Sequence, residues 1–212
     1  MKIGILGSGV VAQTLASGFL KHGHAVTLGT REPDRLRDWA AQNPQARIAG
    51  VAAAAQFGEL LVLAVKGSAA AAVLRSAGAD NLAGKPVIDT NNPLADAPPV
   101  HGVLSYFTKA NDSLMEQLQR EFPQARLVKA FSSVGAARMV NPQYAGGRPT
   151  MFICGNDDAA KTTVSTLLDA FGWNVADMGK AIAARAIEPL AVLWCIPGFL
   201  QDQWTHAFAL LT

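Results

Sequence analysis

Short apolar runs alternate with longer stretches of helical periodicity over the first 89 residues. The apolar runs predict strands at residues 2–6, 25–29, 47–51, 60–65 and 85–89. The intervening stretches predict helices at residues 10–21, 33–41, 52–57 and 68–77. Because strands and helices alternate, and residues 60–65 are apolar without a break, the pattern predicts an α/β fold with a doubly wound parallel sheet.

The pattern changes after residue 89, where the sequence predicts a loop of about twenty residues, a length usual for functional or mobile loops. Ser113 and Glu116 then have the spacing of a capping box and predict a helix that runs to about residue 122. The remaining pattern predicts a second βαβ-like unit and two apolar terminal helices, at residues 126–130, 150–154, 157–171, 173–177, 181–195 and 198–211. We therefore expect two domains with a soft boundary, residues 1–125 and a small α/β carboxy-terminal domain at residues 126–212.

A glycine turn connects the first predicted strand to the first predicted helix, with the pattern Gly7-x-Gly9-x-x-Ala12. Gly7 permits the tight turn, Gly9 lets the backbone approach a diphosphate, and Ala12 lets the helix pack closely on the sheet. The first helical turn also offers unpaired N–H groups and a positive dipole end. We therefore predict a Rossmann-type dinucleotide site that includes Ser8, Val10 and Val11; the alternative is an ordinary strand-to-helix turn.

The end of the second strand predicts which nucleotide binds. An NAD site usually has an acidic residue there to bind the ribose hydroxyls, whereas this chain has Thr30 followed by Arg31. The Arg31 guanidinium suits a 2′-phosphate, and Arg35 could supply a second charge. The sequence thus predicts NADP(H). Glu32 argues the other way unless it only complements the start of the next helix, and either arginine could instead be a plain surface charge.

The carboxyl ends of the later strands should line the rest of the cofactor site, because open α/β sheets bind ligands there. Those ends predict contacts from Val65, Lys66, Asn92, Pro93 and Ala130. The Asn92 amide could orient the nicotinamide ring or its carboxamide, or only form a turn. Lys66 could meet the diphosphate or remain in solvent.

Composition limits the binding partners, the role of the cysteines and the cellular location that we expect. Net charge is +2 with interspersed charges, so no nucleic-acid partner is expected. The two cysteines, Cys154 and Cys195, lie far apart, which favours buried thiols in a reducing compartment over a metal or redox site. Charged residues and prolines interrupt the apolar segment at 181–200, so we expect no membrane span and a cytoplasmic protein.

Several motifs in order resemble the NADPH:deazaflavin oxidoreductase family, whose members exchange hydride between NADP and the deazaflavin coenzyme F420. The same fold is similar to the cytosolic NADPH domain of six-transmembrane metalloreductases. The resemblance implies a Rossmann domain, a small carboxy-terminal domain that forms a cleft with it, and a homodimer. The motifs are Gly7-x-Gly9-x-x-Ala12, Gly29-Thr30-Arg31, Asn92-Pro93-Leu94, Val128-Lys129-Ala130-Phe131, Gly147-Arg148-Pro149-Thr150-Met151-Phe152, Gly172-Trp173 and Glu188-Pro189-Leu190.

Two positions depart from that family. Ser132 and Ser133 follow Lys129-Ala130-Phe131 where relatives usually have Asn, and Lys66 stands where they usually have proline. Ser132, Ser133 and Asn92 are the candidates for contact with the reacting rings, although the serines could instead cap a helix. Hydride exchange with a flavin-type ring needs stacking rather than a dedicated acid or base. The acceptor could therefore be F420 or FMN/FAD, and the alternatives are an NADPH-dependent flavin or ferric reductase, a hydroxyacid or pyrroline-carboxylate reductase, and a non-catalytic NADP(H) sensor.

Overall fold

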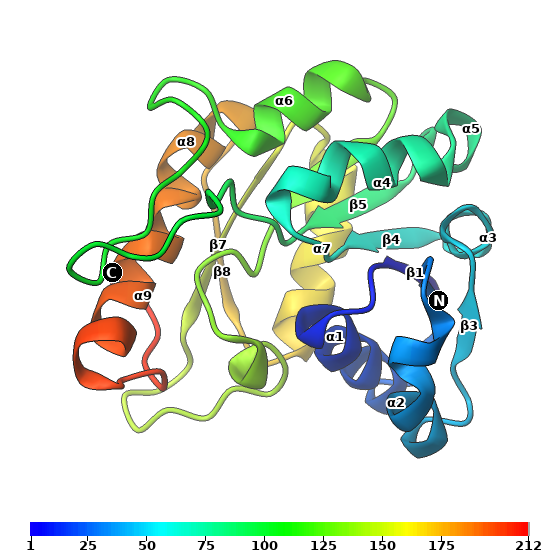
Figure 1. Ribbon diagram of the computed structural model, residues 1–212, viewed down its shortest axis with the longest axis horizontal. Helices are drawn as coiled ribbons and strands as arrows, with labels where there is room; N and C mark the ends of the chain where they lie inside the picture. Colours follow the sequence, from blue (N-terminus) through cyan, green and yellow to red (C-terminus); the bar gives the residue numbers. More distant parts are fainter. Residues whose placement is uncertain (212) are drawn as a thin grey trace.

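A computed structural model describes residues 1–211 and contains one eight-stranded sheet with the order β3-β2-β1-β4-β5-β6-β7-β8 (Figure 1). The strands from β3 to β6 are parallel, β7 runs antiparallel to β6, and β8 is parallel to β7. The strands are β1 (Lys2–Leu6), β2 (Ala25–Gly29), β3 (Arg47–Ala49), β4 (Leu60–Leu63), β5 (Pro86–Asp89), β6 (Arg126–Lys129), β7 (Thr150–Gly155) and β8 (Asn174–Asp177).

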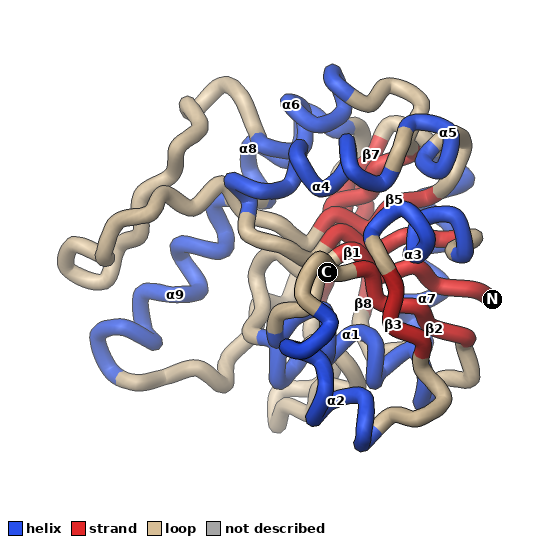
Figure 2. The backbone as a smooth tube through the Cα atoms, turned by 45° about the vertical axis from the view of Figure 1, so that its right-hand side comes forward, coloured by secondary structure: helices blue, strands red, loops and turns tan. Residues whose placement is uncertain are grey.

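Helices cover both faces of this sheet. The helices are α1 (Val10–Lys21), α2 (Arg37–Gln42), α3 (Val51–Phe57), α4 (Ala70–Ala77), α5 (Ala79–Leu82), α6 (Leu114–Glu121), α7 (Asp158–Ala170), α8 (Ala184–Ile187) and α9 (Pro189–Gln201). Short 3-10 turns lie at Pro33–Leu36, Gly67–Ala69, Ala136–Arg138 and Ala181–Ala183. Figures 1 and 2 show α1 and α2 on one side of the strands and α4, α5 and α6 on the other.

Two apolar clusters form the core, one on each face of the sheet. Helices α1 and α7 meet on the first face, where Phe19 and Phe171 are fully buried with ring centroids 4.9 Å apart. Helices α3, α4, α6 and α8 supply the second cluster, which includes Leu74 and Met115. Burial of the sheet on both faces explains the continuous apolar sequence of β4.

The doubly wound parallel sheet predicted from the sequence is confirmed through β6. The capping box is also confirmed, because Ser113 Oγ accepts from the Glu116 N–H at 3.1 Å and the Glu116 carboxylate accepts from the Ser113 N–H at 3.0 Å. The βαβ-like unit near the carboxyl end forms as predicted, with β7 and β8 parallel and α7 between them in sequence.

The strands beyond residue 125 continue the same sheet. Strand β6 pairs with β5 along its whole length, from Pro86 opposite Arg126 to Asp89 opposite Lys129. The carboxy-terminal segment therefore extends the sheet that carries the glycine turn, and the division into domains at 1–125 and 126–212 stays a prediction.

The predicted final helix at 198–211 is wrong beyond residue 201. Helix α9 continues through Pro197 and ends at Gln201, because Asp202 adopts a left-handed conformation with φ of 54°. Residues 202–211 are irregular and fold back onto the protein. The Trp194 indole donates to the His206 carbonyl at 2.8 Å, and the Thr150 N–H donates to the Phe208 carbonyl at 2.9 Å. These hydrogen bonds and aromatic packing replace the helical pairing that the apolar composition alone predicted.

Candidate functional site

The glycine turn between β1 and α1 has the geometry that its sequence predicts. Gly7 has φ of 144°, and a Cβ added there would lie 2.1 Å from the Ala64 carbonyl oxygen, so a larger residue does not fit. Gly9 precedes the first residue of α1, and an added Cβ would meet nothing within 4 Å. No side chain caps the first turn of α1. Open space above Gly9 and uncapped N–H groups fit the diphosphate of a dinucleotide.

A cavity of about 580 Å³ opens above this turn, at the point where the strand order reverses between β1 and β4. This is where open α/β sheets bind dinucleotides. Eleven of the predicted cofactor residues line it, namely Gly7, Ser8, Gly9, Val10, Val11, Thr30, Arg31, Arg35, Val65, Lys66 and Asn92. Several further residues line the cavity that no sequence pattern assigned to it, among them Val51, Gly67, Ala69, Val73 and Leu94.

Five other predicted residues are not in the lining of this cavity: Ala12, Pro93, Ala130, Ser132 and Ser133. Ala12 and Ala130 are fully buried, which suits close packing of a helix and a strand end behind the cavity. Ser132 and Ser133 are 5% and 7% exposed. Ser132 reaches the lining indirectly, because its carbonyl accepts from Asn92 Nδ2 at 2.8 Å.

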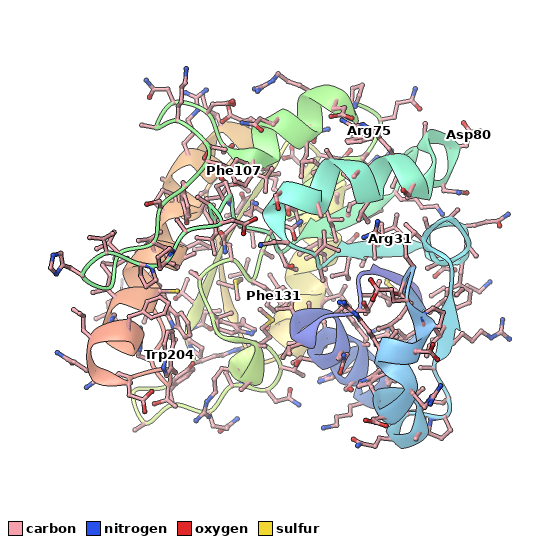
Figure 3. The ribbon with its side chains drawn as sticks, in the orientation of Figure 1. Arg31, Arg75, Asp80, Phe107, Phe131 and Trp204 are labelled. Atoms are coloured by element: carbon pink, nitrogen blue, oxygen red, sulfur yellow. The ribbon has the colours of Figure 1, made fainter. Side chains whose placement is uncertain are left out.

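Charged side chains dominate the end of the cavity beside β2. Thr30 Oγ1 accepts from the Glu32 N–H at 3.0 Å, which fixes the turn after the strand. Arg35 lines the cavity, but its Nε lies 2.6 Å from the Glu32 carboxylate. Figure 3 shows Arg31 close to the turn between β1 and α1. Within residues 1–211, Arg31 forms no ion pair, so its guanidinium is available to an anion.

Side-chain amides and the Asp89 carboxylate form a hydrogen-bond network at the opposite end, beside β4, β5 and β6. Asp89 ends β5, and its Oδ1 accepts from both the N–H and the Nδ2 of Asn91, at 3.0 and 2.9 Å. Asn91 Oδ1 in turn accepts from the Val65 N–H at 3.1 Å. Together with the hydrogen bond from Asn92 to Ser132, these contacts tie the three strand ends to one another.

A buried ion cluster lies directly behind these strand ends, and no sequence pattern predicted its ion pairs. Lys129 Nζ lies 2.7 Å from Asp89 and 2.9 Å from Glu188, and it donates to the Asn91 carbonyl at 2.8 Å. The side chains of all three charged residues are at most 2% exposed. Burial acts to lower the pKa of Lys129, but the charges of Asp89 and Glu188 outweigh it and raise that pKa above its ordinary value.

The second carboxylate of this cluster is compensated by the start of a helix. Glu188 accepts from the N–H groups of Leu114 and Met115, each at 3.0 Å, in the first turn of α6. These N–H groups and the positive end of the helix stabilise the extra negative charge. The cluster therefore connects β5 and β6 to the start of α9, where Glu188 stands.

Lys66 lies at the rim of the cavity and pairs with Asp96 of the long loop after β5. Both side chains are more than half exposed, so the pair is screened by solvent. Lys66 therefore lies at the cavity mouth with a carboxylate beside it, and whether it meets the diphosphate stays a prediction.

The thiols and the other titratable groups offer little for metal or nucleophilic chemistry. Both cysteines are free, and burial raises the pKa of the Cys154 thiol to about 12, which keeps it protonated. Cys195 is only partly buried, whereas the sequence predicted a buried thiol. Among the residues that the structure describes, no group of three or more His, Cys, Asp or Glu side chains could hold a metal ion.

The helical stretch Ala181–Gln201 is long and apolar enough to cross a membrane by length and composition, and 33% of its most apolar window is buried in the fold. Of the charges and prolines expected to interrupt it, Pro197 lies inside α9 without ending that helix, whereas Glu188 and Pro189 stand where α8 ends and α9 begins. Core helices can pass the same test, and Glu188, in the middle of this stretch, is held by the buried Lys129. The finding is weak evidence for a span.

A mostly parallel sheet with a glycine turn at its switch point defines a Rossmann-type dinucleotide-binding fold, and the arginine that follows β2 suits an NADP site. The family described as "NADP oxidoreductase coenzyme F420-dependent" matches residues 2–93. A protein of Arthrobacter sp. FB24, provisionally described as an F420-dependent NADP reductase, is 36% identical with a TM-score of 0.94, and the match covers 100% of both chains. The chain belongs to this family of F420-dependent NADP oxidoreductases, and it is an NADPH-dependent oxidoreductase.

Two further relatives are more distant or larger. Metalloreductase STEAP3 of Rattus norvegicus is 33% identical over 205 residues, which are 94% of this chain. The chain spans only 39% of the length of that protein. The Streptomyces aurantiacus imine reductase is 17% identical with a TM-score of 0.71 over 94% of this chain and 63% of its own, which is a similarity of fold alone.

Proposed function

We propose that the acceptor is a flavin-type ring, and that this protein exchanges hydride between NADPH and a deazaflavin of the F420 type. The observation that carries the proposal is the makeup of the cavity end beside β4 and β5, where Val65, Asn92 and Leu94 supply apolar surface and a neutral amide. Hydride transfer between two stacked rings needs orientation and exclusion of water rather than a dedicated acid or base.

The lining residues divide into two groups in this proposal. The turn at Gly7, Ser8 and Gly9, with Val10 and Val11, would hold the diphosphate through backbone N–H groups. Thr30 and Arg31 would bind the 2′-phosphate, and Arg35 would join them by leaving Glu32. When bound, NADPH supplies the hydride, while the protein binds and orients the dinucleotide.

The residues near the reacting rings follow from the same division. Val65, Lys66 and Asn92 would surround the nicotinamide, with Pro93 and Ala130 packed behind them. Ser132 and Ser133 remain our candidates for contact with the acceptor. Their burial beside Asn92 supports a place close to the rings, although no hydrogen bond of either hydroxyl is present within residues 1–211.

The acceptor can be identified by turnover. The purified protein is mixed with NADPH and, in separate reactions, with F420, FMN or FAD, while the absorbance of the reduced nicotinamide is followed. Fastest oxidation with F420 is the expected result. Oxidation of NADPH by none of the three rings would overturn the acceptor proposal and favour a non-catalytic NADP(H) sensor.

A flavin or ferric-flavin reductase is the second candidate, and the similarity to a metalloreductase over 94% of this chain favours it. Flavin and deazaflavin rings share a shape, so one site could take either. The same assay separates the two, because preference for FMN or FAD, with ferric iron as the final electron acceptor, would replace the deazaflavin proposal.

We also propose that the protein is a cytoplasmic homodimer, as the family resemblance implies. Helix α9 leaves Leu193, Phe199 and Leu200 exposed by 44% or more. A second copy of this chain would cover that apolar surface, because exposed apolar patches are typical of interfaces. Sedimentation equilibrium of the protein and of Leu193→Glu tests this, with a dimeric native protein and a more dissociated variant expected; a monomeric native protein contradicts it.

A further inference from the structure

Asn92 has one half of its side-chain amide bonded and the other half unbonded. Its Nδ2 donates to the Ser132 carbonyl at 2.8 Å, across 40 residues of sequence. Its Oδ1 is buried and has no hydrogen-bond partner within the described residues, although Asn92 lines the cavity. An unsatisfied buried acceptor costs about 1–3 kcal/mol, so a partner for Oδ1 would stabilise whatever state provides one.

The backbone around Asn92 fixes which half of the amide is free. A carbonyl oxygen only accepts, so the amide nitrogen must face Ser132, and the reverse orientation would place two acceptors together. Phe131 aims this carbonyl from a left-handed conformation with φ of 62°, which is unusual for a large side chain. Phe131 is 2% exposed, and its N–H donates to Met151 Sδ at 3.1 Å, so the surrounding core holds the turn in place.

Gly67 fixes the backbone of Asn92 from the other side. A Cβ on Gly67 would lie 2.1 Å from the Asn92 carbonyl oxygen, so the two segments touch through backbone atoms. Figure 3 shows Phe131 near the middle of the molecule, with Arg31 farther toward the edge that carries β2 and β3. Asn92 follows β5 and Arg31 follows β2, three strands away in the sheet, so Asn92 lies at the other end of the cavity from Arg31.

We propose that Asn92 Oδ1 accepts an N–H from the nicotinamide carboxamide, so that this site requires a hydrogen-bond donor on the ring substituent. The inference rests on the proposed binding mode, in which the nicotinamide lies beside β4 and β5. The terminal amide torsion has a broad energy minimum, so a modest rotation would bring Oδ1 into line with the carboxamide N–H while Nδ2 stays within hydrogen-bond distance of the Ser132 carbonyl. Asn92 then selects the ring substituent by its hydrogen-bonding polarity.

The test compares the binding of NADP+ with that of its 3-acetylpyridine analogue, in which a methyl group replaces the carboxamide NH2. Isothermal titration measures affinity without turnover, so the altered redox chemistry of the analogue does not matter. The native protein should bind NADP+ about 5- to 150-fold more tightly than the analogue, since the analogue leaves the buried acceptor unpaired. Asn92→Leu and Asn92→Ala should bind both ligands with nearly equal affinity.

Asn81→Ala is the matched control. The Asn81 amide also donates to a backbone carbonyl, that of Ala77 at 2.7 Å, but it lies on α5 outside the cavity lining. This variant should keep the discrimination of the native protein. Equal affinities of the native protein for NADP+ and the analogue would overturn the inference, whether or not the Asn92 variants fold.

Titration with 2′,5′-ADP distinguishes this failure from failure of the proposed binding mode. The fragment carries the adenosine and the 2′-phosphate but no nicotinamide. If the native protein binds 2′,5′-ADP but binds NADP+ and the analogue equally well, only the proposed role of Asn92 is wrong. If the native protein binds none of the three ligands, the proposed function is wrong and the inference with it.

Discussion

The two ends of the cavity differ in whether their charged side chains are exposed or buried. At the β2 end, Arg31 and the Glu32–Arg35 pair are solvent-exposed charges, with side-chain exposure of 70% for Arg35 and 53% for Glu32. At the β5 end, Asp89 and Lys129 are fully buried, and internal hydrogen bonds fix every strand end. Exposed charges recognise an anion at little structural cost but are screened by salt, whereas buried charges fix geometry and destabilise the fold strongly when one is removed.

Removing the cation of the buried ion cluster should have the largest effect on stability. Lys129→Met leaves Asp89 and Glu188 buried without their cation, and we expect it to lower the free energy of unfolding by about 3–5 kcal/mol. Urea denaturation measures the loss. Lys180→Met is the control, because the Lys180–Asp158 pair is exposed and should contribute less than about 1 kcal/mol. Similar losses in the two variants would contradict the contrast between the buried and exposed ends.

Removing the exposed arginine should change binding without changing stability. Arg31→Ala is expected to weaken NADPH binding about 10- to 100-fold, because a hydrogen bond to a charged group contributes about 1.5–3 kcal/mol, and to leave NADH binding unchanged. Fluorescence titration at low and high salt checks both points, and the native preference for NADPH should decrease as salt rises. Arg37→Ala, whose guanidinium pairs with Asp34 outside the cavity lining, should behave like the native protein.

Substitution of the two motif glycines should affect different properties, stability at Gly7 and cofactor binding at Gly9. Gly7→Ala should destabilise the protein by about 1–3 kcal/mol, because of its positive φ and its contact with the Ala64 carbonyl. Gly9→Ala should leave the melting temperature almost unchanged. It should weaken the binding of both NADPH and NADH, since its methyl group would enter the open space above the turn. Gly146→Ala, also in open space but outside the cavity lining, is the control for Gly9. Native cofactor affinity in Gly9→Ala would show that the diphosphate does not approach this residue.

The smallest effect is expected at the ion pair beside Arg31. Glu32→Gln frees Arg35 for the 2′-phosphate and should strengthen NADPH binding by up to about fivefold, the size of a surface ion pair of at most about 1 kcal/mol. The ratio of NADPH to NADH affinity measures this gain. Asp34→Asn is the matched control, because Asp34 pairs with Arg37. A weaker preference for NADPH in Glu32→Gln would mean that the carboxylate assists binding.

The amino-acid sequence by itself determined the alternating strands and helices, the turn at Gly7 and Gly9, the capping box at Ser113, and the absence of an acid at Thr30 and Arg31. These features depend on residues within a few positions of one another, so backbone preference and apolar periodicity are enough to predict them. The same local reasoning predicted a helix at 198–211 and failed, because apolar composition does not distinguish a helix from a segment folded onto Trp194.

Only the tertiary structure decided the partners of the polar groups. It paired Arg35 with Glu32, brought Ser132 to Asn92 across 40 residues, and placed Lys129 between Asp89 and Glu188. The sequence shows that these groups can donate, accept or carry charge, but a buried polar group is stabilised by whichever partner the packed strands and helices bring within about 3 Å. That choice depends on segments far apart in the chain meeting at one edge of the sheet, which no local pattern encodes.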